Sequence, residues 1–343
     1  MPQRPRLTPA VADLRRAVRE ALPVVATVET LVLVALSGGP DSLALAAATA
    51  FEAPRAGSRA GAVIIDHGLQ DESAATAERA AEQARALGLD PVRVVRVEVT
   101  ETGEGPESAA RTARYAALDA VAAELGAVAI LLGHTLDDQA ETVLLGLARG
   151  SGSTSLHGMA PQAGLYVRPL LGIRRSITVQ ACADQGLEPW NDPHNDDPAY
   201  ARVRVRRTVL PLLEQELGPG VAEALARTAE QLREDSDALD TFADEVADDI
   251  AELEEAGVSL GVAALAANPA ALRQRMIRLV AASEFHVSLS RAQTLAIARL
   301  VTDWHGQGPV DLPGFTAERR GHRIHLVSTE AGTLTGVKPP HDH

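Results

Sequence analysis

The hexapeptide from Ser37 to Ser42 (SGGPDS) places two glycines, two hydroxyls and one carboxylate between an apolar run and an Ala/Leu-rich stretch. A loop of this kind, between a strand and the start of a helix, offers backbone N–H groups and the positive end of the helix dipole to an oxyanion. It lacks the GK[ST] ending of a Walker A loop and the third glycine of a dinucleotide-binding loop. We predict a phosphate-binding loop made of Ser37, Gly38, Gly39, Pro40, Asp41 and Ser42. The alternative for the hexapeptide is a glycine-rich turn without a ligand. The alternative for Asp41 is simple capping of the following helix by its carboxylate.

The segment GHTLDDQAET carries His134 followed by three carboxylates, those of Asp137, Asp138 and Glu141. On a helix, residues three or four apart share a face, so Glu141 lies beside Asp138 and Asp137. Carboxylates grouped in this way could hold a cationic substrate or accept a proton. Acidic residues in a first turn also stabilise a helix through its dipole, and a lone histidine there can be a cap or a packing residue, so these alternatives stay open.

Other charged residues also have spacings that fit binding. Glu107, Arg111 and Arg114 recur on one helical face, where they could meet a nucleotide or form a solvated Glu–Arg surface. Asp66 and His67 follow an apolar run as candidate nucleotide neighbours, although Asp-His-Gly is also a typical turn. A basic segment suited to RNA phosphates contains Arg202, Arg204, Arg206 and Arg207.

The elements that must position these residues are strands alternating with helices. Apolar runs at 30–36, 61–66, 91–99 and 128–133 predict strands, and the Ala-rich segments between them predict helices. This order predicts an α/β fold with a doubly wound, mostly parallel sheet, which binds ligands beyond the carboxyl ends of its strands. Because SGGPDS, IDHG and GHTLDD all follow strand ends, we expect them to converge on one site.

The alternation stops beyond Gly150, and the sequence Gly218-Pro219-Gly220 predicts a boundary. We expect an amphipathic helix within residues 1–29, the α/β domain over 30–218, a smaller, mostly helical domain over 219–330 and a disordered tail over 331–343. In the smaller domain, helical spacing runs from Val221 to about Glu255, and alternation over 309–327 predicts a terminal hairpin.

The amino-acid composition excludes several classes of protein. A net charge of −14 argues against a protein whose whole surface binds nucleic acid, and 3% aromatic residues argue against a broad base-stacking platform. Cys182 is the only cysteine, which excludes an intramolecular disulfide and fits a reducing compartment. No window has the run of about 20 apolar residues that a membrane-spanning helix needs. The N-terminal segment has no apolar core typical of an export signal.

The SGGPDS string resembles the loop of the PP-loop ATP pyrophosphatases, which split ATP into AMP and pyrophosphate while activating a carbonyl oxygen as its adenylate. The resemblance implies that the loop binds the pyrophosphate end of ATP and that Asp41 helps to hold Mg²⁺. Thiolases of tRNA in this superfamily typically need paired cysteines, whereas Cys182 stands alone.

Further segments resemble the tRNA(Ile)-lysidine synthetases within that superfamily. They are GHTLDDQAETVLLGLARGSGSTSLHGM, the E-x-x-A-R-x-x-R-Y pattern of residues 107–115, and the stretches 168–171, 190–195 and 200–206. The sequence departs from the family at His194, where Ser is usual, and at Val203, where Asn is usual. Both departures concern local RNA contacts more than the chemistry. The length implies a short form without the additional terminal domain of longer members.

This resemblance implies that ATP adenylates the C2 carbonyl oxygen of the wobble cytidine in a CAU-anticodon tRNA(Ile), and that the ε-amine of L-lysine then displaces AMP. It implies ATP and Mg²⁺ as cofactors, a tRNA-binding smaller domain, a cytoplasmic location and a possible homodimer. Catalytic roles fall to Asp41, Asp138, Glu141, Arg111 and Arg114. ATP contacts fall to the hexapeptide, Asp66, His67 and His134, and lysine or tRNA contacts to Asp137, Glu107, Arg202, Arg204 and Arg206.

Two other functions remain as alternatives. A PP-loop synthetase acting on a small carboxylate would form AMP without RNA. A non-catalytic nucleotide-binding protein would bind ATP without turnover. The acidic cluster argues against the second alternative, because ATP binding alone gains nothing from extra carboxylates near three phosphates.

Overall fold

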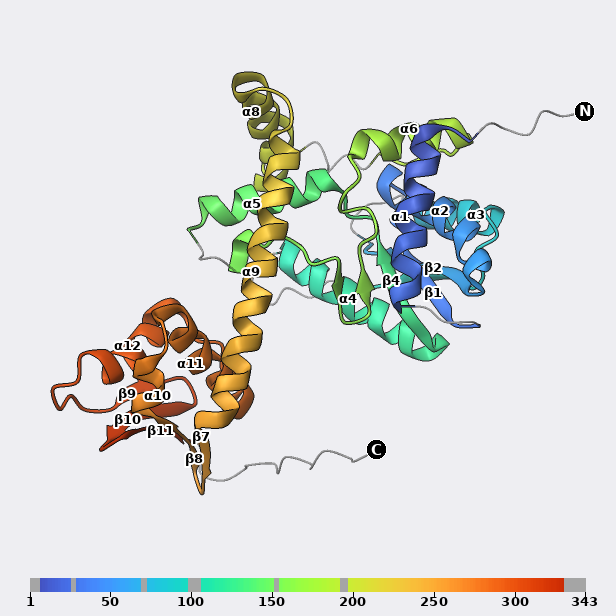
Figure 1. The fold of residues 1–343 in the computed structure, drawn as a ribbon. Coiled ribbons are helices and arrows are strands. Elements are labelled where there is room, and N and C mark those ends of the chain that lie inside the picture. The colour runs from blue at the N-terminus through green and yellow to red at the C-terminus, as the bar shows by residue number, and fades with distance from the viewer. Residues whose placement is uncertain are drawn as a thin grey trace, which may run out of the picture. The chain divides into compact units, whose positions relative to one another are not determined.

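The computed structural model describes residues 7–25, 29–68, 73–97, 106–150, 154–191 and 197–329. Contacts within the chain divide it into two compact units, residues 1–232 and 233–343, and the division falls inside one long helix, α9 (Val221–Ile250). Figure 1 labels most of the helices and strands of both units. The sequence-based boundaries near residues 29, 218 and 330 remain predictions, and each unit is described here by itself.

The first unit is built on a six-stranded sheet in the order β3-β2-β1-β4-β6-β5. The first five of these strands run parallel, and the short β5 pairs antiparallel with β6 at the edge. The strands are β1 (Leu31–Ala35), β2 (Arg59–Asp66), β3 (Val92–Arg96), β4 (Ala127–Leu132), β5 (Gln162–Ala163) and β6 (Tyr166–Val167). The predicted doubly wound, mostly parallel sheet is confirmed.

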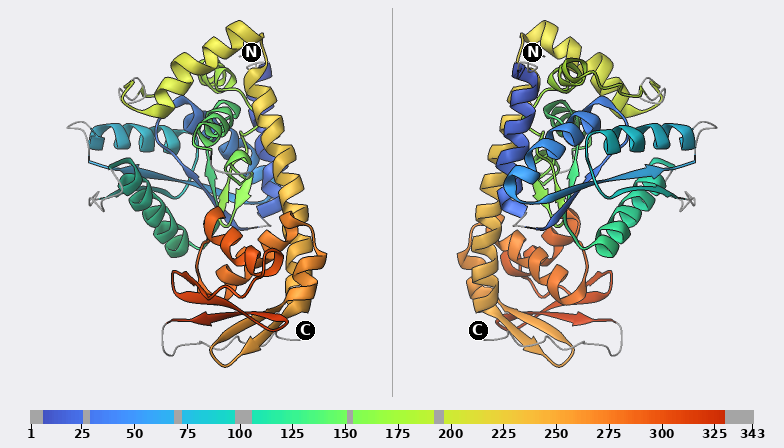
Figure 2. Two further views of the ribbon diagram at one scale, coloured as in Figure 1. Left: turned by 90° about the vertical axis from the view of Figure 1, so that its left-hand side faces the viewer. Right: turned by 90° about the vertical axis from the view of Figure 1, so that its right-hand side faces the viewer.

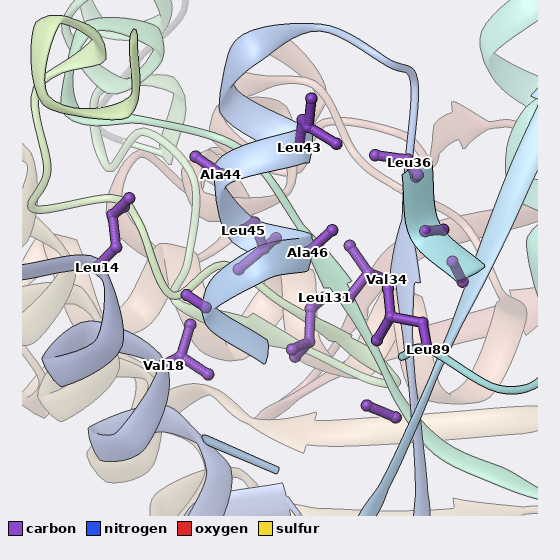
Figure 3. Packing of buried hydrophobic residues seen from close by; sticks show 14 of the residues in the cluster. Leu14, Val18, Val34, Leu36, Leu43, Ala44, Leu45, Ala46, Leu89 and Leu131 are labelled. Atoms are coloured by element: carbon purple, nitrogen blue, oxygen red, sulfur yellow. The ribbon is translucent and has the colours of Figure 1, made fainter. Parts of the chain in front are cut away.

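Side chains alternate across this sheet and form two separate cores. On one face, Val32 and Val34 of β1 pack against α1 (Pro9–Val25), α2 (Pro40–Glu52), α3 (Ser73–Ala86) and α6 (Arg175–Gln185). On the other face, Leu31 and Leu33 pack against α4 (Pro106–Leu125). Figure 2 shows α3 and α4 on opposite sides of the strands, and Figure 3 shows α2 between α1 and the sheet. This two-sided burial explains why the strands read as continuous apolar runs.

The remaining elements of the first unit are helical. Helix α5 (Leu136–Ala148) follows β4 directly, and its residues Leu136 and Ala140 pack against α8 and the start of α9. We predicted no helix or strand for the arginine-rich segment. In the structure, residues 201–217 form a continuous helix with one π-helical turn. The remaining elements are η1 (Pro54–Ala56), η2 (Thr154–Leu156), α7 (Ala201–Arg204), η4 (Val205–Val209) and α8 (Leu210–Leu217).

The second unit contains a five-stranded antiparallel sheet, in the order β7-β8-β11-β10-β9, packed with helices. The predicted terminal hairpin is confirmed as β10 paired with β11. The elements after α9 are β7 (Ala251–Glu254), β8 (Gly257–Gly261), α10 (Val262–Ala267), α11 (Ala270–Phe285), α12 (Arg291–Thr302), β9 (Val310–Leu312), β10 (Phe315–Arg320) and β11 (Arg323–Ser328).

Helical spacing wrongly extended α9 to Glu255, because the helix ends at Ile250 and the chain enters the β7–β8 hairpin. Gly257 explains the change, since a Cβ there would lie 1.9 Å from the backbone oxygen of Leu326 on the neighbouring strand. Only glycine permits so close an approach of two backbones. Within the described parts of the chain, no helix is both long and apolar enough to cross a membrane.

Candidate active site

The hexapeptide forms the loop that joins β1 to α2 at the carboxyl edge of the sheet. Gly38 has a φ of +83°, and its carbonyl accepts a hydrogen bond from the N–H of Trp190 at 2.9 Å. The Ser42 hydroxyl accepts from the N–H of Ser37 at 3.2 Å and donates to the Gly39 carbonyl at 3.1 Å. No described side chain caps the start of α2, so its first N–H groups are available to an anion.

The carboxylate of Asp41 does not cap α2, so the capping alternative for this residue is wrong. Its carboxylate accepts hydrogen bonds from the hydroxyl of Thr178 and from Nε of Arg175, the latter at 3.0 Å. Burial raises the pKa of Asp41 and outweighs the opposing effects of Arg175 and Thr178. The carboxylate therefore lies beside the loop without belonging to the helix cap.

Helix α5 begins with a capping box in which Asp138 takes part. Oδ2 of Asp138 accepts from the N–H and the hydroxyl of Thr135, at 2.8 and 2.7 Å. Oδ1 faces Nη2 of Arg175 at 2.7 Å and Nη2 of Arg206 at 3.2 Å. Burial opposes ionisation of Asp138, but Arg175 and the Thr135 hydrogen bonds outweigh it and lower its pKa. Asp138 can therefore stabilise the start of α5 and contribute to a functional site at the same time.

Glu141 is fully buried on α5 and is surrounded by guanidinium groups. Nε and Nη2 of Arg206 donate to its two oxygens at 2.6 and 3.0 Å, and Nη1 of Arg175 lies 3.3 Å away. Nε of Arg202 is 3.5 Å from Oε2, while the Arg202 guanidinium also donates to Thr142 at 2.8 Å. A buried carboxylate is stable only with such partners.

Arg175 joins these groups into one cluster. Its guanidinium contacts Asp41, after the loop that joins β1 to α2, and both Asp138 and Glu141 on α5, and its side chain is only 22% exposed. Its backbone N–H, at the start of α6, donates to Oδ2 of Asp137 at 2.7 Å. Burial opposes the charge of Arg175, but the three surrounding carboxylates outweigh it and raise its pKa, so Arg175 stays a cation. We refer to Asp41, Asp138, Glu141, Arg175, Arg202 and Arg206 as the charged cluster.

Asp137 points away from the charged cluster and organises the start of α6. It contacts Nη1 of Arg174 at 3.1 Å, and Arg174 also pairs with Glu223 at 2.7 Å and Glu214 at 3.1 Å. Glu214 accepts from backbone N–H groups at the start of α9, above all Ala222, and these hydrogen bonds together with Arg174 lower its pKa to about 2. Arg174 thereby ties α5, α8 and α9 together within the first unit.

A cavity of about 170 Å³ opens between these two groups of charges. Its walls carry both signs of charge and an apolar side, a combination suited to a small zwitterion with an alkyl chain. It is lined by Asp137, Glu141, Arg174, Arg206, Leu210, Pro211, Glu214 and Ala222.

His67 and His134 follow the ends of β2 and β4, as the sequence predicted for nucleotide neighbours. Nδ1 of each ring is buried and has no hydrogen-bond partner among the described residues. Burial lowers the pKa of His134 to about 4, with Asp138 only partly opposing it. Burial, followed by Arg114, also lowers the pKa of His67. Both rings are therefore neutral near pH 7, and their unpaired nitrogens are free for a ligand.

Asp66 closes β2 and accepts a hydrogen bond from the N–H of Gly68 at 2.9 Å. Burial opposes its charge, but this bond and those of its neighbours lower its pKa. The turn-forming alternative is thus realised in part, although Asp66 also lies beside His67. Gly68 has a φ of +63°, which the tight turn requires.

Arg111 and Arg114 lie on α4 over the ring of Tyr115, at 5.1 and 5.5 Å from its centroid. Burial lowers the pKa of Arg114, which also contributes to the field at both histidines. Tyr115 meets Tyr166 edge to face at 4.8 Å. Glu107 belongs to α4, but its side chain lies outside the described residues.

The arginines of this segment lie in different surroundings. Arg202 and Arg206 enter the charged cluster, whereas Nη1 of Arg204 donates to the carbonyls of Pro198 and Ala199, both at 2.7 Å, on the surface. Val203, one departure from the family pattern, is buried at 7% exposure. His194, the other departure, lies outside the described residues.

Sequence reasoning missed Arg174, Arg175 and Thr178, because their partners are far away in the chain. Arg175 is 134 residues from Asp41 and 37 from Asp138. One signal was present: α6 starts with two basic residues and has no acidic residue in its first turn. That arrangement opposes the helix dipole, and so indicates a tertiary partner.

The fold and the site together define a PP-loop protein, and residues 12–213 match the PP-loop domain family. Residues 260–325 match the TilS substrate binding domain family. Among solved structures, a U34-tRNA thiolase from Methanococcus maripaludis aligns with a TM-score of 0.54 over 66% of this chain and 80% of its own, at 20% identity. That likeness concerns the fold alone.

Curated relatives give the narrower family. The tRNA(Ile)-lysidine synthase of Leifsonia xyli subsp. xyli is 65% identical over 84% of this chain and 87% of its own. The corresponding enzyme of Thermobifida fusca is 53% identical over 94% of this chain and 98% of its own. The chain belongs to the tRNA(Ile)-lysidine synthase family, also called the synthetases, as its motifs predicted.

Proposed function

We propose that this enzyme forms lysidine at the wobble cytidine of a CAU-anticodon tRNA(Ile). The C2 carbonyl oxygen attacks the α-phosphorus of ATP, pyrophosphate leaves, and an adenylated tRNA results. The ε-nitrogen of L-lysine then bonds to C2 as the C2–O bond to AMP breaks. The products are lysidine, AMP and pyrophosphate.

The observation that carries this proposal is the contact between the phosphate loop and the acidic face of α5. Asp41 of the loop and Asp138 and Glu141 of α5 meet at one guanidinium, that of Arg175. A nucleotide on the loop would therefore lie next to carboxylates suited to an amine. Adenylation followed by amine attack needs this adjacency, because the second substrate must reach the activated carbon directly.

The loop would hold the β- and γ-phosphates of ATP through the open N–H groups at the start of α2. Among the described residues, no three His, Cys, Asp or Glu side chains lie close enough to hold a metal ion by themselves. Asp41 nevertheless fits Mg²⁺, which commonly takes one or two carboxylates together with substrate phosphates and water. Bound there, Mg²⁺ would screen the charge of the leaving pyrophosphate.

The neutral imidazoles of His67 and His134 offer Nδ1 atoms to the nucleotide or the target base. Arg114, half-buried beside them, would offset negative charge as the adenylate forms. Arg111 and Glu107 would act from the same helix. An unstacked anticodon base is a suitable target, since its Watson–Crick edge is free.

The cavity beside α5 is the proposed lysine site. Its carboxylates would bind the two ammonium groups of lysine, and its arginines would bind the carboxylate. The ε-ammonium must lose a proton before it attacks. We propose that Glu141 accepts this proton. Glu141 lines the cavity, whereas one oxygen of Asp138 already accepts hydrogen bonds from Thr135.

The tRNA would contact the exposed Arg204 and the second unit, consistent with the match of residues 260–325 to a substrate binding domain family. We also propose a cytoplasmic location and a homodimer, the latter tested by light scattering of the purified chain.

The direct test incubates the protein with ATP, Mg²⁺, labelled lysine and either the CAU-anticodon isoleucine tRNA or methionine tRNA. Label entering only the isoleucine tRNA, with one AMP formed per lysine and loss of both in Asp41→Ala, is the expected result. AMP without labelled RNA would instead indicate a synthetase for a small carboxylate. Nucleotide binding without either product would indicate a non-catalytic protein.

A further inference from the structure

In the charged cluster, the Arg175 guanidinium already occupies the place where the proposed function needs Mg²⁺ and the ammonium group of lysine. Arg175 contacts Asp41, the proposed Mg²⁺ carboxylate, and the α5 carboxylates Asp138 and Glu141. Glu141 also lines the proposed lysine cavity. All three of these carboxylates are at most 20% exposed. The inference below rests on the proposed function and concerns the order in which its substrates bind.

The charges of the side chains within the cluster balance one another. Three carboxylates, those of Asp41, Asp138 and Glu141, face three guanidinium groups, those of Arg175, Arg202 and Arg206. A lysine ammonium entering this cluster would be a fourth cation in a poorly solvated space, where like charges repel strongly. ATP brings the opposite charge, because its triphosphate is an anion that a released guanidinium can pair with.

Arg175 is the member of the cluster best placed to move. It stands at the border between the phosphate loop and α5, since its Nε contacts Asp41 in the first turn of α2. Its backbone is fixed by Asp137, so the side chain can swing without displacing α6. Asp138 and Glu141 would keep Arg206 as a partner, and Asp138 would keep Thr135. The carboxylates thus stay ordered after Arg175 leaves.

We propose that Arg175 is a displaceable counter-ion that makes lysine binding depend on ATP. Without a nucleotide on the loop, it neutralises Asp41, Asp138 and Glu141. When ATP occupies the loop, the guanidinium turns to the phosphates, and Asp138 and Glu141 become available to the lysine ammonium. Arg175 is therefore a positioning residue, and ATP and lysine each strengthen the binding of the other by the same factor.

Calorimetric titration of L-lysine, without and with saturating α,β-methylene-ATP and Mg²⁺, measures this coupling directly. For the unaltered protein, we expect the nucleotide to lower the Kd for lysine by at least about fivefold, the lower end of typical coupling between sites. In Arg175→Gln, lysine should bind the nucleotide-free protein more tightly than it binds the unaltered one, and the coupling factor should fall towards one.

Arg19→Gln is the matched control. It also removes a guanidinium from a buried carboxylate, Glu52 at 2.7 Å, but contacts no member of the charged cluster. Its coupling should equal that of the unaltered protein. If Arg175→Gln does not fold, Arg175→Lys tests the coupling instead, because a lysine side chain keeps the charge but cannot contact all three carboxylates. Its coupling should then lie between one and the unaltered value.

The proposal is overturned if the unaltered protein shows no coupling, or if the coupling survives unchanged in the Arg175 variant. Failure of the proposed function is distinguishable, because labelled lysine would then not enter tRNA at all. An enzyme that makes lysidine yet binds lysine independently of the nucleotide keeps its function and loses only this role for Arg175.

Discussion

Thr135 and Asp138 hold each other at the start of α5, with the N–H and hydroxyl of Thr135 at 2.8 and 2.7 Å from Oδ2 of Asp138. The other oxygen of the same carboxylate faces Arg175 and Arg206. One side chain thus ends the sheet-to-helix turn and contributes to the charged cluster. This double use allows its structural and chemical roles to be separated by mutation.

Asp138→Asn should keep the helix cap and lose the reaction. The amide oxygen still accepts from Thr135, but the amide nitrogen then faces Arg175 and Arg206, so we expect the free energy of unfolding to fall by about 3–5 kcal/mol. The neutral amide no longer attracts an ammonium, and lysine incorporation should fall at least about 100-fold. Urea unfolding and the labelled-lysine assay measure the two effects.

Ser290→Ala is the matched control, because Ser290 forms the same kind of capping box with Gln293 at α12 in the second unit. It should cost about 1 kcal/mol of stability without changing the chemical step in single turnover. A rate that falls equally in both variants would show that Asp138 acts only through stability.

Gly38→Ala should weaken ATP binding beyond its effect on stability. Gly38 has a φ of +83°, where a side chain is strained by about 1 kcal/mol, and its new Cβ would lie 3.5 Å from Ala80. The strain reshapes the loop whose N–H groups are proposed to hold phosphate. Nucleotide affinity, measured by calorimetry, should therefore fall.

Gly88→Ala separates strain from function. Gly88 has a similar φ of +88°, and a Cβ there meets nothing within 4 Å. It should lose a similar amount of stability and keep full ATP affinity. Equal ATP affinity in Gly38→Ala and Gly88→Ala would argue against the loop as the phosphate site.

His134 should make the protein less stable in mild acid. Its pKa is about 4 in the folded chain, below the ordinary value near 6.5, so the unfolded chain binds more protons between these pH values. Stability from this residue is present above pH 6.5 and is lost as the pH falls towards 4, by roughly 3 kcal/mol at most. Urea unfolding at several pH values measures this loss, and His134→Gln should flatten that part of the profile. A profile that is the same with and without His134 would mean that the pKa of His134 does not differ between the folded and the unfolded chain.

Phe315→Ala should destabilise the second unit selectively. Phe315 is fully buried and stacks on Phe285 at 4.5 Å, so its removal should cost about 3–5 kcal/mol. The two tryptophans report on different units, Trp190 on the first and Trp304 on the second. With Trp190→Phe or Trp304→Phe as background, urea unfolding should show the larger shift at Trp304. Identical shifts at both would show that the units unfold together.

Local features of the sequence predicted most of the strands of the first unit. The apolar runs predicted its four long strands to within a few residues, because burial on both faces leaves an uninterrupted pattern. The loop and GHTLDD were expected to meet because parallel strands end at the same edge, and Asp41 and Asp138 do share Arg175. In the second unit, β7 and β8 were missed, since the close approach at Gly257 depends on a strand about 70 residues further along.

The sequence by itself determined the α/β class, the glycine-rich loop after β1, the acidic face of α5 and the family, because each is encoded in a short stretch of residues. Only the tertiary structure decided which charges meet. Arg175 and Thr178 reach Asp41 across more than 130 residues, and Glu141 is buried among arginines from another helix. Ion pairs of this kind depend on how distant helices pack, and no local spacing specifies that.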